Sequence, residues 1–484
     1  MRKPSISSAA IWSVLDVSLG QGLTFAISVV LARLLTPDEF GTIALLALFI
    51  AVAGLFVEGG LGQALIQRQD LTEEDCSTVF WFNITVAVVV AGLLAAAAPT
   101  IAVFFDKPVV APLTMVMAAN IVVGAFGMVH RTLFAKRLAF RPLMIAGAVS
   151  TVLSGATVVA CASAGYGVWS LAAQSVVAGL VSTLMLWVLS PWRPHLVFSF
   201  ASVRRLFGFG GYVLAAGLLE VIYSRAHTVL IGKFYGTADL GQFARAEATQ
   251  VLPTTLVTNS FARVALPALS PLAKDKHRMV GAMRYALQIM MLLKAPIMFG
   301  LAVLAEPFIV TLYGPAWLPA VPLLQVLCLA ALLMPLHMLN VQALLAIGRS
   351  NIVFKLEIAK KAVGLTILVA AASFGPFGIA CGIVLTSLLS VAINTSQSQK
   401  LLGYGMLSQL ADSAPATALA ATMAGGLWWV LHVTQDLPEP ARLALSISIG
   451  AAYFSFVATV LRLPGVDALL SMMLRRPYNS STSA

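Results

Sequence analysis

The chain has 484 residues, of which 60% are hydrophobic and only 10% are charged, whereas soluble domains carry about 25% charged residues. Together with a mean hydropathy of +0.93, this composition excludes a soluble globular domain and predicts an integral membrane protein. The net charge of +11 comes with basic residues placed mainly in the loops between apolar segments, so the sequence predicts no nucleic-acid partner.

Apolar segments long enough to cross a bilayer follow one another along the chain. The first follows a short basic N-terminus and has no small-residue cleavage pattern, so we expect a retained span rather than a signal peptide. We expect about fourteen helical spans, each of about 18 or more mostly apolar residues. Their expected cores are 11–32, 42–65, 79–104, 110–130, 143–163, 167–190, 207–231, 243–268, 285–312, 320–345, 352–373, 377–395, 415–433 and 442–461.

The turn between the first two spans occurs twice. Residues 31–41 read LARLLTPDEFG, and residues 231–241 read IGKFYGTADLG, with Gly41 corresponding to Gly241. A repeat at this distance indicates a duplicated half rather than a solenoid. Matching dipeptides open later spans at similar offsets, namely Pro112-Leu113 with Pro322-Leu323 and Gly167-Val168 with Gly378-Ile379.

The duplication predicts the domain organisation. Six spans in each copy give parallel repeats around an axis along the membrane normal. We therefore predict an all-α membrane protein with two six-helix bundles around a central cleft, at residues 1–200 and 201–397. Residues 398–484 add two helices and a tail. Basic residues gather in loops such as 131–141 and 274–284, which predicts that both termini are cytoplasmic.

Four stretches resemble one transporter family. They are LARLLTPDEFG, GLGQALIQRQDLTEEDCSTVFWFN at 60–83, VALPALS at 264–270 and YGPAWLPAVPLLQVL at 313–327. Together they resemble the bacterial polysaccharide transporters, specifically the Wzx-type lipopolysaccharide and exopolysaccharide flippases of the multidrug/oligosaccharidyl-lipid/polysaccharide exporter superfamily. The resemblance implies a MATE-like fold in the bacterial inner membrane. It also implies the flipping of polyprenyl-pyrophosphate-linked oligosaccharide units from the cytoplasmic to the periplasmic leaflet.

On the residues alone, three classes of function stay open. They are a flippase for lipid-linked oligosaccharide, an ion-coupled drug or small-solute antiporter on the same fold, and a membrane-embedded glycan-assembly enzyme or scaffold. The chain has no P-loop, no H-E-x-x-H motif and no nucleophile elbow, so we expect a carrier rather than an enzyme. Four scattered cysteines form no C-x-x-C pair, and we predict no metal or other cofactor.

The flippase hypothesis predicts the binding partners. We expect the lipid-linked oligosaccharide as substrate, membrane lipids as surroundings and the polysaccharide assembly machinery as a contact. Transport would be driven by proton or sodium coupling or by removal of the product. In-span cations gather in the second half of the chain, and an anionic pyrophosphate favours such residues, whereas a cationic drug favours acidic or aromatic linings.

Charged residues inside the spans are the candidate site, since each costs about 2.5–3.5 kcal/mol at a helix centre. Glu357 precedes Lys360 and Lys361 by three and four residues, so these three can alternatively pair along one helix face. Local capping or pairing is the alternative for Asp16. The candidates for holding pyrophosphate are Arg263, Lys294, Lys360, Arg225 and Lys361, and those for ion coupling are Asp16, Glu58, Glu220 and Glu357.

The resemblance bears on some of these positions. Arg263 and Lys360 match positions where relatives in this branch carry a basic residue, whereas Lys294 departs from the pattern. His227 also departs, because it stands where Asp or Asn is common. Asp16 has the location of an acidic coupling residue in the drug exporters of the superfamily, although it lacks a matching motif.

Overall fold

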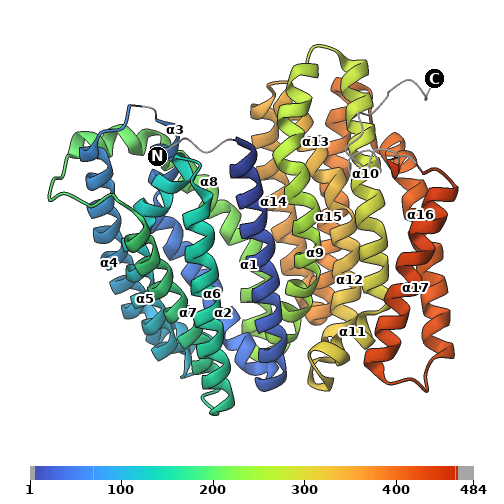
Figure 1. The fold of residues 1–484 in the computed structure, drawn as a ribbon, viewed down its shortest axis with the longest axis horizontal. Helices are drawn as coiled ribbons and strands as arrows, with labels where there is room; N and C mark the ends of the chain where they lie inside the picture. Colours follow the sequence, from blue (N-terminus) through green and yellow to red (C-terminus); the bar gives the residue numbers. More distant parts are fainter. Residues whose placement is uncertain (1–5, 69, 464, 467–484) are drawn as a thin grey trace. The chain divides into compact units, whose positions relative to one another are not determined.

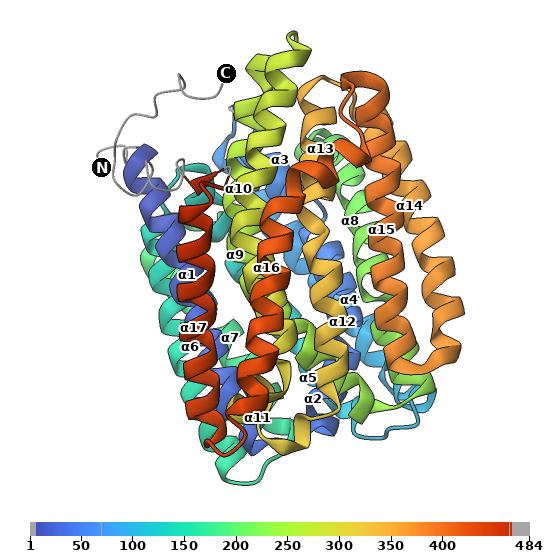
Figure 2. The ribbon, with the colours of Figure 1, turned by 90° about the vertical axis from the view of Figure 1, so that its right-hand side faces the viewer.

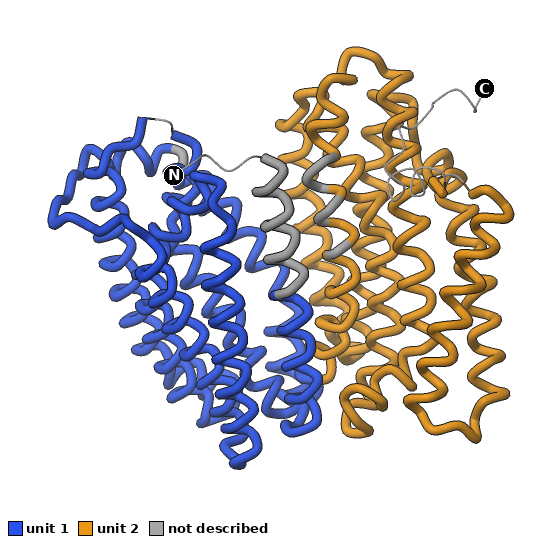
Figure 3. Tube along the Cα trace, in the orientation of Figure 1, with its two compact units in different colours: residues 1–241 blue, residues 242–484 orange. Residues whose placement is uncertain are grey.

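The computed structural model describes residues 6–68, 70–463 and 465–466, without the side chains of 6–19, 209, 256, 259, 260 and 262–264. Throughout this part the chain is helical and contains no strand, and eleven helices are long and apolar enough to cross a membrane. The expected all-α membrane protein is thereby confirmed. By its internal contacts the chain divides into two units, residues 1–241 and 242–484 (Figure 3).

The first unit is built mainly from long helices that run roughly alongside one another, with the short α3 between α2 and α4 (Figure 1). They are α1 (Ile6–Leu34), α2 (Pro37–Glu58), α3 (Leu61–Gln67), α4 (Glu73–Phe104), α5 (Val110–Lys136), α6 (Phe140–Ser163), α7 (Val168–Leu189), α8 (Phe200–Phe234) and the start of α9 (Thr237–Leu269). The main neighbours are α4 with α5, α6 with α7, α1 with α6, α5 with α7, and α2 with α8.

Helix starts in this unit follow from local sequence. Thr36 caps α2 and Thr72 caps α4, and in each helix an acidic residue three positions later, Glu39 or Asp75, returns the hydrogen bond in a capping box. Acidic residues in the first turn also interact favourably with the positive end of the helix dipole. Both polar starts can therefore sit beside an apolar span without unsatisfied backbone donors.

Small residues allow the helices to lie close together. A Cβ at Gly155 of α6 would fall on Ile27 of α1, and a Cβ at Gly232 of α8 would fall on Leu45 of α2. Close approach at small residues is a common means of packing helices in membranes, because lipid supplies little hydrophobic drive between them. These glycines thus hold the α1–α6 and α2–α8 contacts.

The second unit contains the remaining helices. They are the rest of α9, then α10 (Lys276–Val303), α11 (Ala305–Leu312), α12 (Ala320–Leu332), α13 (Met334–Ala346), α14 (Ser350–Ala371), α15 (Gly375–Leu402), α16 (Met406–Val433) and α17 (Glu439–Val460). One of its core clusters gathers residues of α10, α13, α15, α16 and α17. In Figure 2, α10 lies beside α16 and α12, which are its main neighbours.

Three of the expected spans are divided. Segment 42–65 becomes α2 and α3, because Gly59 and Gly60 take positive φ angles of 53° and 66° and end the first helix. Segment 285–312 divides at Leu304, and segment 320–345 divides at Leu333, just before Pro335. Fourteen membrane crossings, and the repeat boundaries at residues 200 and 397, stay predictions.

Candidate functional site

Lys360 lies in a satisfied polar cluster of the second unit. Its side chain on α14 is 5% exposed, and its Nζ donates to Glu357 Oε1 at 2.5 Å and to Asn394 Oδ1 of α15 at 3.2 Å. Asn394 Nδ2 in turn lies 2.9 Å from Nδ1 of His337 on α13. The ammonium group therefore has both a counter-ion and a neutral acceptor, which a buried charge requires.

Lys294 is buried without such partners. Its side chain on α10 is 0% exposed, and among the described residues its Nζ has no hydrogen-bond partner. Neighbouring positions on α10 are apolar and buried, including Met290, Met291 and Met298. An unpaired ammonium group in such surroundings costs several kcal/mol. This side chain is thus suited to an anion that enters the bundle.

The other candidate residues differ in their exposure to solvent. Glu58 is exposed at the end of α2, Glu220 is exposed on α8, and Arg225 of α8 and Lys361 of α14 are half-buried. The backbones of α1 and α9 pass through Asp16 and Arg263, but both side chains lie outside the described residues. Of the nine candidates, the structure brings Lys360 and Glu357 into direct contact.

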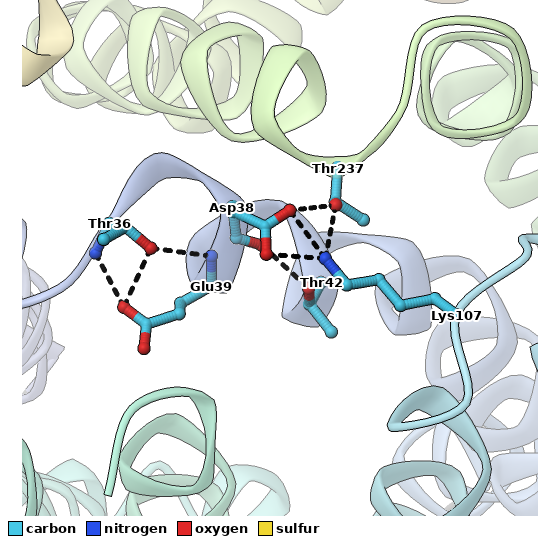
Figure 4. A network of polar contacts seen from close by, with 6 residues as sticks. All are labelled: Thr36, Asp38, Glu39, Thr42, Lys107 and Thr237. Atoms are coloured by element: carbon cyan, nitrogen blue, oxygen red, sulfur yellow. Dashed lines mark hydrogen bonds and ion pairs between the residues drawn. The ribbon is translucent and has the colours of Figure 1, made fainter. Parts of the chain in front are cut away.

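A second polar network lies at the turn between α1 and α2 (Figure 4). Lys107, in the turn between α4 and α5, places Nζ 2.6 Å from each carboxylate oxygen of Asp38 and donates to Thr237 Oγ1 at 2.6 Å. Thr237 also donates to Asp38, and Thr42 Oγ1 donates to the Asp38 carbonyl at 2.8 Å. The network therefore joins the first copy of the repeated turn to the second copy.

The two copies also contact each other through glycine. A Cβ at Gly41 would fall on the carbonyl oxygen of Thr237, and a Cβ at Gly241 would fall on that of Pro37. Because Pro37 and Thr237 are equivalent in the repeat, as are the two glycines, the contact is reciprocal in the manner of a two-fold interface. Alignment alone established the equivalence of the glycines. The alignment did not show that the two glycines lie close together, which required the structure.

Lys233 strengthens the same end of the first unit. Its Nζ donates to the carbonyl oxygen of Phe104 at 2.6 Å and lies 3.3 Å from Oδ2 of Asp106. The ammonium group also lies 5.0 Å from the centre of the Phe104 ring. The end of α8 is thereby attached to the turn that follows α4.

Arg245 is buried near the start of α9. Its guanidinium lies 4.8 Å from the ring centre of Tyr313 and 5.0 Å from that of Trp317. Tyr313 OH is 2.9 Å from Thr249 Oγ1, one turn further along α9. Tyr313 and Trp317 of the YGPAW sequence thus bind the Arg245 guanidinium with their aromatic faces, which attract such cations. Sequence spacing gave no sign of this contact.

Comparison with known proteins identifies the family. A model described as "Polysaccharide biosynthesis protein" matches residues 30–322. The chain belongs to this family. A second model, "Lipid II flippase MurJ", matches residues 228–443. The family match contains the first three of the four resembling stretches.

Individual relatives of this polysaccharide biosynthesis family come from different bacteria. The chain is 29% identical to the succinoglycan biosynthesis transport protein ExoT of Rhizobium meliloti, over 84% of this chain and 80% of the relative. It is 25% identical to the lipopolysaccharide biosynthesis protein WzxC of Escherichia coli, over 81% and 80%. The resemblance to Wzx-type flippases of the exporter superfamily is thus confirmed, and the family consists of transporters rather than enzymes.

Solved structures agree on the fold. The lipid II flippase MurJ in an inward closed conformation superposes with a TM-score of 0.75 at 14% identity, covering 96% of this chain and 100% of that one. An inward-facing multidrug transporter of the MATE family gives a TM-score of 0.63 at 16% identity, covering 81% and 98%. At these identities the likeness concerns the fold alone.

Proposed function

We propose that this polysaccharide biosynthesis protein flips polyprenyl-pyrophosphate-linked oligosaccharide units from the cytoplasmic to the periplasmic leaflet of the bacterial inner membrane. The named relatives include a transporter for succinoglycan biosynthesis, and the fold is that of a lipid II flippase. The observation that carries the proposal is Lys294, a fully buried cation without a partner among the described residues. An anionic head group would supply that partner.

Lys294 and Arg263 hold the pyrophosphate in this proposal. Arg offers a planar fork for phosphate oxygens, and Lys offers a compact charge. Lys360 assists only when it leaves Glu357, which occupies its ammonium group in the present structure. Arg225 and Lys361 would contact the head group before or after the main site.

The topology belongs to the same proposal. Fourteen spans in two parallel repeats, with both termini in the cytoplasm and the last two helices added outside, would enclose a central cleft. The Asp38–Lys107–Thr237 network then lies at the periplasmic end. We propose that it keeps this end closed while substrate enters from the cytoplasm, and that it opens for release. Asp16 and Glu58 are the proposed sites of proton or sodium coupling.

The test is transport by variants of Arg263 in a strain that depends on this protein. Arg263→Ala should lose most transport and cause lipid-linked units to accumulate on the cytoplasmic leaflet. Arg263→Lys should keep part of the activity, because it keeps the charge but loses the bidentate fork. The measurement is transport per molecule of inserted protein. Near-normal transport by Arg263→Ala at normal abundance would contradict the proposed role.

A further inference from the structure

The contact between α9 and α10 fixes their register in the second unit. The two helices are joined by a short turn, so they run in opposite directions. Thr254 Oγ1 of α9 lies 3.9 Å from the sulfur of Met298 on α10. These two residues therefore mark one common level of the helix pair.

One helical turn away, this register assigns Thr258 of α9 and Lys294 of α10 to corresponding positions. Four residues make about one turn, so moving from Thr254 to Thr258 follows the same direction as moving from Met298 back to Lys294. Thr258 is 5% exposed, and its Oγ1, like the Nζ of Lys294, has no hydrogen-bond partner among the described residues. Two unsatisfied donors thus lie on facing helices.

The Thr258 hydroxyl lacks the hydrogen bond that other buried threonines of this unit make. Thr249, Thr386 and Thr395 each donate to the carbonyl four residues earlier, at 2.8 Å. This bond is the usual solution for a threonine within a helix. Thr258 does not make it, although an unsatisfied buried hydroxyl is costly. Its hydroxyl is consequently available to a ligand.

We propose that Thr258 and Lys294 form one anion subsite, in which both donate hydrogen bonds to the same phosphate group of a prenyl pyrophosphate. This inference rests on the proposed function and adds Thr258 as a residue that contacts the substrate. The ammonium group supplies charge, and the hydroxyl fixes the direction from which a phosphate oxygen approaches. Charge-assisted hydrogen bonds of this kind are stronger than neutral ones.

The probe is farnesyl pyrophosphate, with farnesol as the uncharged control. Binding to the purified full-length protein in detergent is measured as a dissociation constant, alongside the melting temperature without ligand. Thr258→Val should weaken binding by about tenfold, the value for loss of one hydrogen bond to a charged group, and Thr258→Ser should restore it. Farnesol binding should not change in either variant.

A matched control separates the subsite from general damage. Thr386 is also buried, at 7% exposure, but its hydroxyl is already bonded to Gly382. Thr386→Val should leave pyrophosphate binding unchanged and lower the melting temperature. Thr258→Val removes an unsatisfied group, so its melting temperature without ligand should stay the same or rise. A fall in melting temperature with unchanged binding would assign Thr258 a purely structural role and overturn the inference.

The Lys294→Gln variant distinguishes failure of the Thr258–Lys294 subsite from failure of the proposed function. If Lys294→Gln loses binding while Thr258→Val binds like the parent, the subsite is wrong but the proposed function stands. If both variants bind like the parent, water alone satisfies these groups and both proposals fail. If the two residues share one phosphate, the double variant should lose less affinity than the product of the single losses, since contacting groups are non-additive. Independent, multiplicative losses would contradict a shared phosphate.

Discussion

Lys360 and Lys294 are both buried lysines of the second unit, yet their surroundings are opposite. Lys360 has a carboxylate and an amide oxygen within 3.2 Å, whereas Lys294 has no partner among the residues that the structure describes. Burial of a charge therefore does not by itself indicate a binding site. What distinguishes a site from a structural ion pair is whether the protein already supplies the opposite charge.

The largest effect should come from Lys294→Gln. Loss of the ammonium group removes a charge-assisted hydrogen bond, so transport should fall at least about tenfold. Abundance should stay normal, because no carboxylate among the described residues loses its partner. The measurement is transport per molecule of inserted protein. Reduced abundance with normal specific transport would show that Lys294 is paired within the fold and would remove the contrast with Lys360.

Lys360→Met should affect stability more than transport. It leaves Glu357 and Asn394 without the ammonium group, and breaking a fully buried pair costs about 3–5 kcal/mol. The Glu357 side chain is 32% exposed, so water compensates in part and we expect about 1–3 kcal/mol. The melting temperature in detergent should fall accordingly.

The second substitution Glu357→Gln provides the control for Lys360→Met. The double variant has no uncompensated charge, so it should recover much of the lost stability. If transport is lost while stability is retained, Lys360 contacts substrate and the comparison between the two lysines fails.

The sequence predicted part of the surroundings of Lys360 but not those of Lys294. Pairing of Glu357 with Lys360 was predictable, because a separation of three residues places them on one helical face. Asn394 and His337 come from other helices, so their contribution required tertiary structure. Nothing in the sequence distinguishes a cation with partners on another helix from one without, and the state of Lys294 was therefore not predictable.

In the first unit, the repeated turn was also only partly predictable from the sequence. The equivalence of Gly41 and Gly241 was evident from the aligned sequences, and the lengths of the apolar segments located nearly every helix. The direct contact between the two glycines was not evident, because a repeat shows relatedness rather than proximity. Nothing in the sequence indicated that Lys107 joins Asp38 to Thr237.

Gly41→Ala tests whether a fully satisfied network also has a role in transport. The new Cβ would fall on the carbonyl oxygen of Thr237, so the repeated turns would separate at a cost of about 1–3 kcal/mol. We expect a severalfold loss of transport and increased labelling of a cysteine introduced near this turn. Gly92→Ala is the control, since a Cβ there meets nothing within 4 Å. Unchanged labelling and transport in Gly41→Ala would show that the network has no gating role.

The smallest effect concerns the acidic candidates Asp16 and Glu58. Glu58 is exposed at the end of α2, and an exposed carboxylate needs no internal partner, so its removal should not reduce abundance. If Asp16 and Glu58 together bind a proton or a cation, as two neighbouring carboxylates can, the double variant Asp16→Asn, Glu58→Gln should keep a basal rate. That rate should no longer respond to an imposed proton or sodium gradient. Transport in vesicles with each gradient measures this directly, with Asp436→Asn, an exposed acidic residue between α16 and α17 that is not a coupling candidate, as the control. A gradient response equal to that of the parent would assign coupling to other residues and leave the phosphate-binding cations unaffected.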